Sequence, residues 1–118
     1  MKIVGFSQLR NELSKGNLEH WFKCMSVCDY IYIFDQASDD GSHEIYAQHD
    51  NVVLIQSDQN RFNEEILCKK QLLEKVISDH PDTDWIFWID GDTMIDQRLM
   101  DNDYELMKDM LKVSAEAG

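Results

Sequence analysis

The chain has 118 residues, 43% of them hydrophobic, and a formal net charge of -12 at pH 7. That length suits one domain, and the hydrophobic content is sufficient for a packed core. A surface this acidic repels nucleic acid and anionic lipid, so we expect neither as a partner. By the same reasoning, an anionic ligand would need a cation between itself and this protein.

The sequence predicts neither a targeting signal nor a membrane span. The apolar segment 2–6 is too short for the core of a signal peptide, and no apolar run approaches the roughly 20 residues of a transmembrane helix. Cys24, Cys28 and Cys68 are odd in number and scattered, which favours buried free thiols over a disulfide framework or a zinc site. We therefore expect a cytoplasmic, reducing environment.

Four short apolar runs predict β-strands at residues 3–6, 30–34, 52–55 and 85–89. Each is rich in β-branched or aromatic residues and is apolar on both faces rather than alternating. That pattern is typical of strands covered on both sides, as in a parallel sheet.

Helical spacing of apolar residues separates the strands. Residues 18–28 repeat apolar side chains every three or four positions, with Asn17 able to cap the start. Ser42 could cap a short helix that contains Ile45 and Tyr46. The resulting alternation predicts an α/β fold with three layers (α/β/α) around a mainly parallel sheet of about four strands.

A longer helix is predicted over about residues 63–80, where Pro81 ends it. Its apolar stripe comprises Ile66, Leu73, Val76 and Ile77. The tail at 102–113 reads as one further amphipathic helix, and no strand is expected after it.

Polar residues follow all four predicted strands. They are Ser7, Arg10 and Asn11 after the first, Asp35, Gln36, Ser38, Asp39 and Asp40 after the second, Gln56, Ser57, Asp58 and Asn60 after the third, and Asp90, Asp92 and Thr93 after the fourth. Open α/β sheets bind ligands at the carboxyl ends of their strands, although loops are polar in general.

The most informative stretch is the acidic triplet Asp90-Gly91-Asp92, which directly follows an apolar strand. Residues i and i+2 of an extended chain point the same way, so both carboxylates can converge, and Gly91 leaves room for a ligand. Two adjacent carboxylates repel each other unless a cation lies between them, and Mg²⁺ or Mn²⁺ prefers oxygen ligands. The alternative is a plain acidic turn, which Asp and Gly also favour.

Two other kinds of protein share part of this acidic pattern. An EF-hand loop needs Gly at its sixth position, where Ile95 stands, so that reading fails. A haloacid-dehalogenase-like phosphatase also has two Asp separated by one residue after an apolar strand. There, however, Thr usually follows the second Asp by two places and the motif opens the fold, whereas Thr93 follows Asp92 at once after the fourth strand.

Together these motifs resemble the family-2-like glycosyltransferases of GT-A fold. The likeness rests on Arg10-Asn11-Glu12 after the first strand, the loop from Asp35 to Ser42, the long helix after a polar loop, and the triplet that closes the fourth strand. It covers roughly residues 2–96. It implies a Rossmann-like fold and a metal-dependent transferase that takes a nucleotide-diphosphate sugar as donor and passes the sugar to an acceptor that the sequence does not identify.

The resemblance also implies roles for particular residues. Asp35 and Gln36 fall where the family binds nucleobase and ribose, although many members have a second Asp where Gln36 stands. Asp90 and Asp92 would bind Mn²⁺ or Mg²⁺, and with Gly91 they would contact the donor diphosphate. Lys70 would approach the phosphates, as its neighbour Lys69 could. Arg10 would either face the donor or pair with Glu12.

Whole enzymes of this type are longer than 118 residues, so residues 1–118 are expected to form a single donor-binding domain of a larger enzyme. Its catalytic base would lie outside this chain, and a homodimer could form through the surface left uncovered. The four histidines, His20, His43, His49 and His80, show no ligand spacing and are expected to have surface or capping roles. A phosphatase and a non-catalytic nucleotide-binding or interaction domain remain as alternatives.

Overall fold

A computed structural model describes residues 1–95 and 97–117 of the chain. Four parallel strands form one sheet in the order β3-β2-β1-β4. Their bounds are β1 Ile3–Leu9, β2 Tyr30–Gln36, β3 Val52–Ser57 and β4 Trp85–Trp88. The predicted parallel α/β architecture is therefore confirmed.

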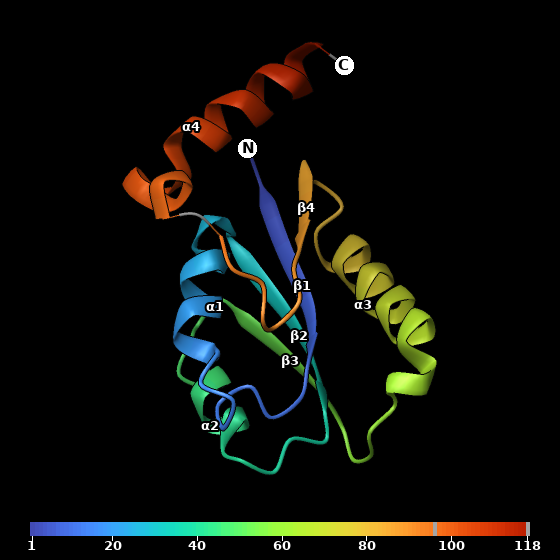
Figure 1. The fold of residues 1–118 in the computed structure, drawn as a ribbon. Coiled ribbons are helices and arrows are strands. Elements are labelled where there is room, and N and C mark those ends of the chain that lie inside the picture. The colour runs from blue at the N-terminus through green and yellow to red at the C-terminus, as the bar shows by residue number, and fades with distance from the viewer. Residues whose placement is uncertain (96, 118) are drawn as a thin grey trace.

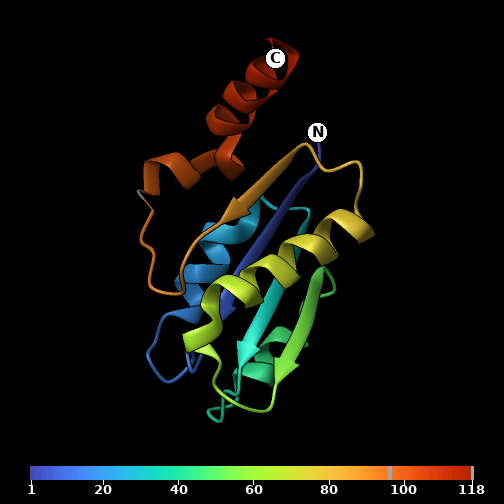
Figure 2. The ribbon, with the colours of Figure 1, turned by 90° about the vertical axis from the view of Figure 1, so that its right-hand side faces the viewer.

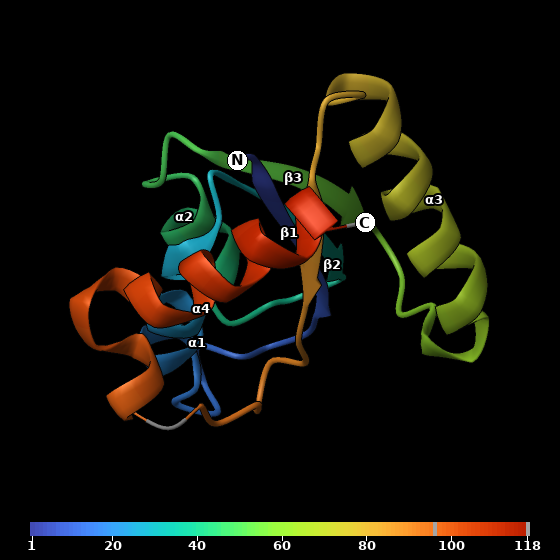
Figure 3. The ribbon, with the colours of Figure 1, turned by 90° about the horizontal axis from the view of Figure 1, so that it is seen from above.

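Helices cover both faces of the sheet, which gives three layers (Figures 1 and 2). On one face lie α1 (Leu18–Cys24), which continues into a 3-10 turn at Met25–Val27, and α2 (Ser42–Tyr46). On the other lies α3 (Glu65–Asp79), after a 3-10 turn at Phe62–Glu64. The last helix, α4 (Gln97–Ala117), lies on the α1 side, at the end of the sheet where the chain begins (Figures 1 and 3).

Two buried clusters occupy the two faces of the sheet. Between the sheet and α1, the cluster is built around Trp21, Met25 and Ile33, all fully buried. Beneath α3, it comprises Val4, Phe6, Tyr32, Phe34, Cys68, Leu72 and Val76. The cysteines Cys24, Cys28 and Cys68 are buried and free, as predicted.

Three strands run further than the apolar runs suggest. Leu9 of β1 pairs with Asp35 of β2, and Gln36 of β2 pairs with Ser57 of β3. The polar residues Asp35, Gln36 and Ser57 therefore belong to strands rather than to loops. Hydrogen bonds between parallel strands satisfy the backbone groups of a residue whatever its side chain. A pattern of hydrophobic residues therefore does not show where strand pairing ends. By contrast, β4 ends at Trp88, one residue before the predicted end.

The expectation that all strands are covered on both faces is wrong for β4. This strand lies at the edge of the sheet, beside β1. Ile86 and Trp88 pair with Val4 and Phe6, which places them on the α3 face, yet they remain 39% and 42% exposed. The helix α3 packs over β1 and β2 and leaves this edge partly uncovered.

The predicted apolar stripe of the long helix is also wrong in part. Of its residues, Val76 is buried, but Ile66 is 86% exposed and Ile77 is 54% exposed. The buried face of α3 is formed by Cys68, Leu72 and Val76, spaced four residues apart.

The side chains of Asn17 and Ser42, the two predicted helix caps, do not cap their helices. Asn17 occupies the N-cap position of α1, but its amide donates to Glu12 Oε2 at 2.7 Å instead of capping the helix. Ser42 lies inside α2, after Gly41 at the N-cap position, and its hydroxyl donates to Asp40 Oδ1 at 2.5 Å. Both side chains therefore tie loops together.

Helix α4 is longer than the predicted segment 102–113 and contains one left-handed residue, Tyr104, with φ of 61°. Tyr104 is fully buried, and its hydroxyl donates to the carbonyl of Cys24 at 2.7 Å. That bond fastens α4 to the end of α1. Within the residues that the structure describes, no helix is both long enough and apolar enough to cross a membrane.

Candidate functional site

The acidic triplet forms a turn at the carboxyl end of β4. The amide of Thr93 donates to the carbonyl of Asp90 at 3.2 Å, and the amide of Asp90 donates to the Thr93 hydroxyl at 3.1 Å. The sequence reasoning placed Asp90 and Asp92 on extended chain, where they would point the same way. In the structure they are the first and third residues of a turn, the geometry that Asp and Gly favour.

Two residues of β1 and its following loop hold this turn in place. The hydroxyl of Ser7, which is fully buried, donates to the carbonyl of Ile89 at 2.7 Å. The carboxyl group of Glu12, only 8% exposed, packs directly against Gly91. The strand β1 and the loop after it therefore fix the position of the turn that carries the two acidic residues.

Both carboxylates of the triplet are exposed. Across the described part of the chain, neither Asp90 nor Asp92 makes a hydrogen bond or ion pair through its carboxylate. Nor do the described residues contain a group of three or more His, Cys, Asp or Glu side chains placed to hold a metal ion. Among the described residues, Asp90 and Asp92 offer two carboxylates here, which suits Mg²⁺-type ions that keep water and substrate phosphate as their remaining ligands.

Lys69 and Lys70 are adjacent on α3 but make different contacts. Lys69 Nζ lies 3.5 Å from the centroid of the Trp88 ring, a cation–π contact two residues before the triplet. Lys70, which the resemblance favoured, has a side chain that is 70% exposed and lies 3.9 Å from Glu74. Lys69 is thus held near the end of β4, whereas Lys70 lies in a surface ion pair on its own helix.

Arg10 braces the loop after β2. Its Nη1 donates to the carbonyls of Gln36, at 2.5 Å, and Ala37, at 2.9 Å. The predicted alternative of a pair with Glu12 is wrong, because the Glu12 carboxylate takes Lys15 and Asn17 as partners. Ala37 has φ of 54°, an unusual conformation for a residue with a side chain, and the Arg10 contact holds its carbonyl.

Asp35 is fully buried at the end of β2, and its carboxylate is surrounded by donors. The amide and hydroxyl of Ser38 donate to it at 2.9 and 2.5 Å. His43 Nε2 lies 2.5 Å from Asp35 Oδ2. A buried carboxylate is costly unless it is hydrogen-bonded in this way.

Gln36 is also fully buried and joins three segments of the chain. Its Nε2 donates to Gln8 Oε1 at 3.1 Å, and its Oε1 accepts from the amide of Arg61 at 2.8 Å. Gln8 in turn donates to the carbonyl of Glu65 at the start of α3. The side chain of Gln36 thus links β2 to β1 and to the loop before α3.

The next loop residues form a second polar cluster around Asp40. Its carboxylate accepts from the amide and hydroxyl of Ser42 and from the amide of Ser14. Burial acts to raise the pKa of Asp40, but these hydrogen bonds outweigh it and lower the pKa to about 2. The charged carboxylate therefore fastens the β1–α1 loop to the start of α2.

Two hollows open at the carboxyl ends of β2 and β3. One, of about 390 Å³, is lined by Ala37, Ser38, His43, Gln56, Ser57 and Asp58. The other, of about 490 Å³, lies towards α3 and includes Phe34, Arg61 and Gln71 in its lining. The predicted binding edge of the sheet is therefore indented beside the residues that the sequence singled out.

Sequence reasoning missed two residues at this edge. His43 was assigned a surface or capping role, but it both contacts Asp35 and lines the smaller hollow. Ser7 was noted only as a polar residue, but it holds the carbonyl that precedes Asp90. The spacing of residue types could not reveal either contact, because each joins two different elements: His43 and Asp35 join α2 to β2, and Ser7 and Ile89 join β1 to the end of β4.

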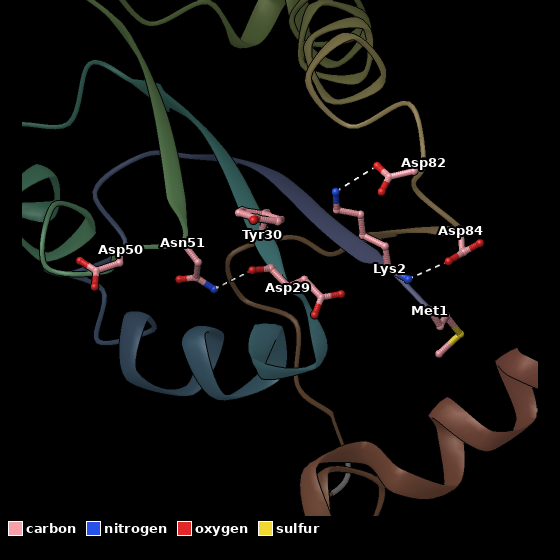
Figure 4. A pocket seen from close by; sticks show the side chains of 8 residues that line it. All are labelled: Met1, Lys2, Asp29, Tyr30, Asp50, Asn51, Asp82 and Asp84. Carbon is pink, nitrogen blue, oxygen red and sulfur yellow. Dashed lines mark hydrogen bonds and ion pairs between the residues drawn. The ribbon is translucent and has the colours of Figure 1, made fainter.

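A broader hollow, of about 760 Å³, lies at the opposite, amino ends of the strands (Figure 4). Three of its acidic residues stabilise the local fold. Asp82 lies 3.0 Å from Lys2 Nζ, Asp84 accepts from the amide of Lys2 at 2.7 Å, and Asp29 accepts from the amide of Ile3 at 2.8 Å. None of the predicted site residues lines this hollow.

A comparison with protein families finds a match over most of the chain. The family model of the galactosyl transferase GMA12/MNN10 family matches residues 35–115. That range begins at Asp35, includes Lys70 and the acidic triplet, and leaves Arg10 outside. No curated protein matches the chain. The motif resemblance to family-2-like enzymes correctly predicted a glycosyltransferase. Since the matched range covers more than half of the sequence, the chain belongs to this galactosyl transferase GMA12/MNN10 family.

Proposed function

We propose that this chain binds the nucleotide-diphosphate sugar donor of the transfer reaction, and that it does so through Mn²⁺ or Mg²⁺ held at Asp90 and Asp92. The observation that carries the proposal is a pair of exposed acids, without partners in the described chain, on a turn braced by Ser7 and Glu12. Membership of a transferase family supplies the sugar donor and acceptor in general terms.

The residues of the turn fit such an ion. Carboxylate oxygens are the hard ligands that Mg²⁺ and Mn²⁺ prefer, and two of them suffice when phosphate completes the coordination. A chain with net charge -12 repels a free diphosphate, so a cation is needed between the two. When bound, a divalent ion would stabilise the charge that develops on the departing nucleoside diphosphate.

The other residues of the edge have supporting roles in this proposal. Arg10 holds the two carbonyls that shape the loop after β2, and Lys69 places a positive charge beside the last residue of β4. The hydrogen bonds of the buried Asp35 and Gln36 side chains stabilise the part of the site where the nucleoside would bind. Lys70 could reach the donor phosphates only after leaving Glu74, an exposed pair that costs little to break.

The proposal is tested by calorimetric titration of a nucleoside diphosphate, such as UDP, in the presence and absence of Mn²⁺. We expect binding only with the ion, and a rise in Kd of about tenfold or more, equivalent to about 1.4 kcal/mol, for Asp92→Ala. Asp50→Ala is the matched control, since it removes the same charge from an exposed position at the other end of the sheet. Equal binding by wild type and Asp92→Ala would refute the metal assignment.

A further inference from the structure

Asp35 and Gln36 occupy the positions where the motif resemblance places nucleoside contacts, but their polar atoms are already engaged. Both side chains are fully buried. The Asp35 carboxylate accepts from Ser38 and contacts His43, while the Gln36 amide bonds Gln8 and the backbone of Arg61. Neither residue lines the 390 Å³ hollow. A ligand in that hollow would therefore meet other side chains.

His43 is the residue that connects Asp35 to the hollow. It lines the cavity, and its side chain is 34% exposed, whereas that of Asp35 is 0% exposed. Its Nε2 is held by Asp35, and the hydrogen bonds of the described residues leave Nδ1 as the ring nitrogen that can serve a ligand. Because Asp35 is itself fixed by Ser38, the ring is held in one orientation before any ligand arrives.

The chemistry of the hollow favours a neutral polar group. Its lining has one carboxylate, Asp58, and amide and hydroxyl groups on Gln56 and Ser57, but neither Lys nor Arg. A diphosphate would be repelled there, whereas ribose hydroxyls and the edges of a nucleobase can bond these groups. A volume of about 390 Å³ lies within the range of small-ligand sites.

We propose that this hollow takes the nucleoside of the donor, and that His43 is the residue that contacts it while Asp35 positions the imidazole. This inference rests on the proposed function, because the diphosphate would lie towards the metal at Asp90 and Asp92. It moves direct nucleoside recognition from the buried acid of β2 to the first turn of α2.

The test compares two kinds of ligand, each titrated with Mn²⁺. UDP and GDP report on nucleoside and phosphate together, and inorganic pyrophosphate reports on the phosphate site alone. The main variant is His43→Gln, whose amide can reproduce the Nε2 contact with Asp35 but not Nδ1. His49→Gln is the matched control, since His49 stacks on Phe22 and does not line the hollow.

We expect His43→Gln to raise the Kd of the nucleoside diphosphate that binds wild type by about tenfold, as for the loss of one good hydrogen bond. The Kd of pyrophosphate should remain unchanged, as should both values in His49→Gln. Asp35→Asn should weaken nucleoside diphosphate binding in the same direction. Adding it to His43→Gln should cause no further loss, because Asp35 acts on the ligand only through the imidazole ring of His43.

Three results would overturn the inference. If His43→Gln leaves the Kd of every probe unchanged, His43 does not contact the ligand. If it weakens pyrophosphate and nucleoside diphosphate equally, its effect is structural. In both cases the metal proposal stands as long as Asp92→Ala raises the Kd of pyrophosphate by about tenfold or more. If wild type binds none of the probes with Mn²⁺, the proposed function fails, and this inference with it.

Discussion

The carboxyl group of Glu12 fills the space that a side chain at Gly91 would occupy. A Cβ atom built on Gly91 would overlap the Glu12 side chain and would lie 2.6 Å from its Oε1. The backbone of Gly91 is outside the left-handed region, so space rather than conformation requires glycine here. The loop after β1 and the acidic turn after β4 are thus in direct contact.

Gly91→Ala should therefore lower the free energy of unfolding by about 1–3 kcal/mol, the usual cost of adding an atom to a packed site. Urea denaturation monitored by tryptophan fluorescence measures it. The change should also weaken Mn²⁺-dependent binding, since the turn that carries Asp90 and Asp92 must move.

A double-mutant cycle with Glu12→Ala separates overlap from other effects. Glu12→Ala alone loses the contacts with Lys15 and Asn17. In its background, Gly91→Ala should cost little, because the obstructing carboxyl group is absent. The same cost in both backgrounds would show that Glu12 is not the obstacle.

The buried face of α3 gives a second prediction. Leu72 is fully buried, and Leu72→Ala should cost about 2–5 kcal/mol of unfolding free energy through the cavity it leaves. Ile77 is 54% exposed on the same helix, so Ile77→Ala should cost less than about 1 kcal/mol. Equal losses for the two variants would mean that the helix is rotated about its axis relative to the structure.

These two helix positions also show what the sequence could and could not predict. The pattern of apolar runs predicted four parallel strands and the helices between them, because buried strands and amphipathic helices have different periods. It could not fix the rotation of α3, since Ile66 and Ile77 are as hydrophobic as the residues that are buried. Only the packing of α3 over β1 and β2 selects Cys68, Leu72 and Val76.

The candidate site was predictable to a similar degree. The acidic triplet and the polar loop after β2 were identified because chemistry-bearing residues gather where strands end. The burial of Asp35 and its contact with His43 were not, because they depend on how the loop between β2 and α2 folds back. The brace from Ser7 to Ile89 joins residues 82 positions apart, and pairing of β1 with β4 creates it.

Asp40 gives a prediction about pH. Its pKa is about 2 in the folded protein against 3.8 for the free group, so the folded state favours the charged carboxylate. The resulting stabilisation is fully present above about pH 4 and is lost as the pH falls through about 2. Asp40→Asn should reduce the free energy of unfolding by about 1–2 kcal/mol near neutral pH, because hydrogen bonds to a charged acceptor are weakened.

The measurement is the difference in unfolding free energy between wild type and Asp40→Asn, taken from urea titrations at several pH values. The comparison cancels other acids that titrate in the same range, such as Asp79 and Asp82, whose pKa values are also lowered by hydrogen bonds from Tyr32 and Lys2. The difference should shrink between about pH 4 and pH 2. A difference independent of pH would mean that the carboxylate charge contributes nothing to the loop.

Ser7 links stability to the candidate metal site. Its buried hydroxyl donates to the carbonyl of Ile89, the residue before the acidic turn. Ser7→Ala leaves that carbonyl without its donor and should cost about 1–2 kcal/mol of unfolding free energy. Because the bond also fixes where Asp90 leaves the strand, we expect the same variant to raise the Kd of Mn²⁺-pyrophosphate severalfold in calorimetric titration. Ser78→Ala is the control, since Ser78 is exposed on α3 and should change neither quantity. Loss of stability with unchanged pyrophosphate binding would restrict Ser7 to a role in the sheet and would show that the turn keeps its geometry without this brace.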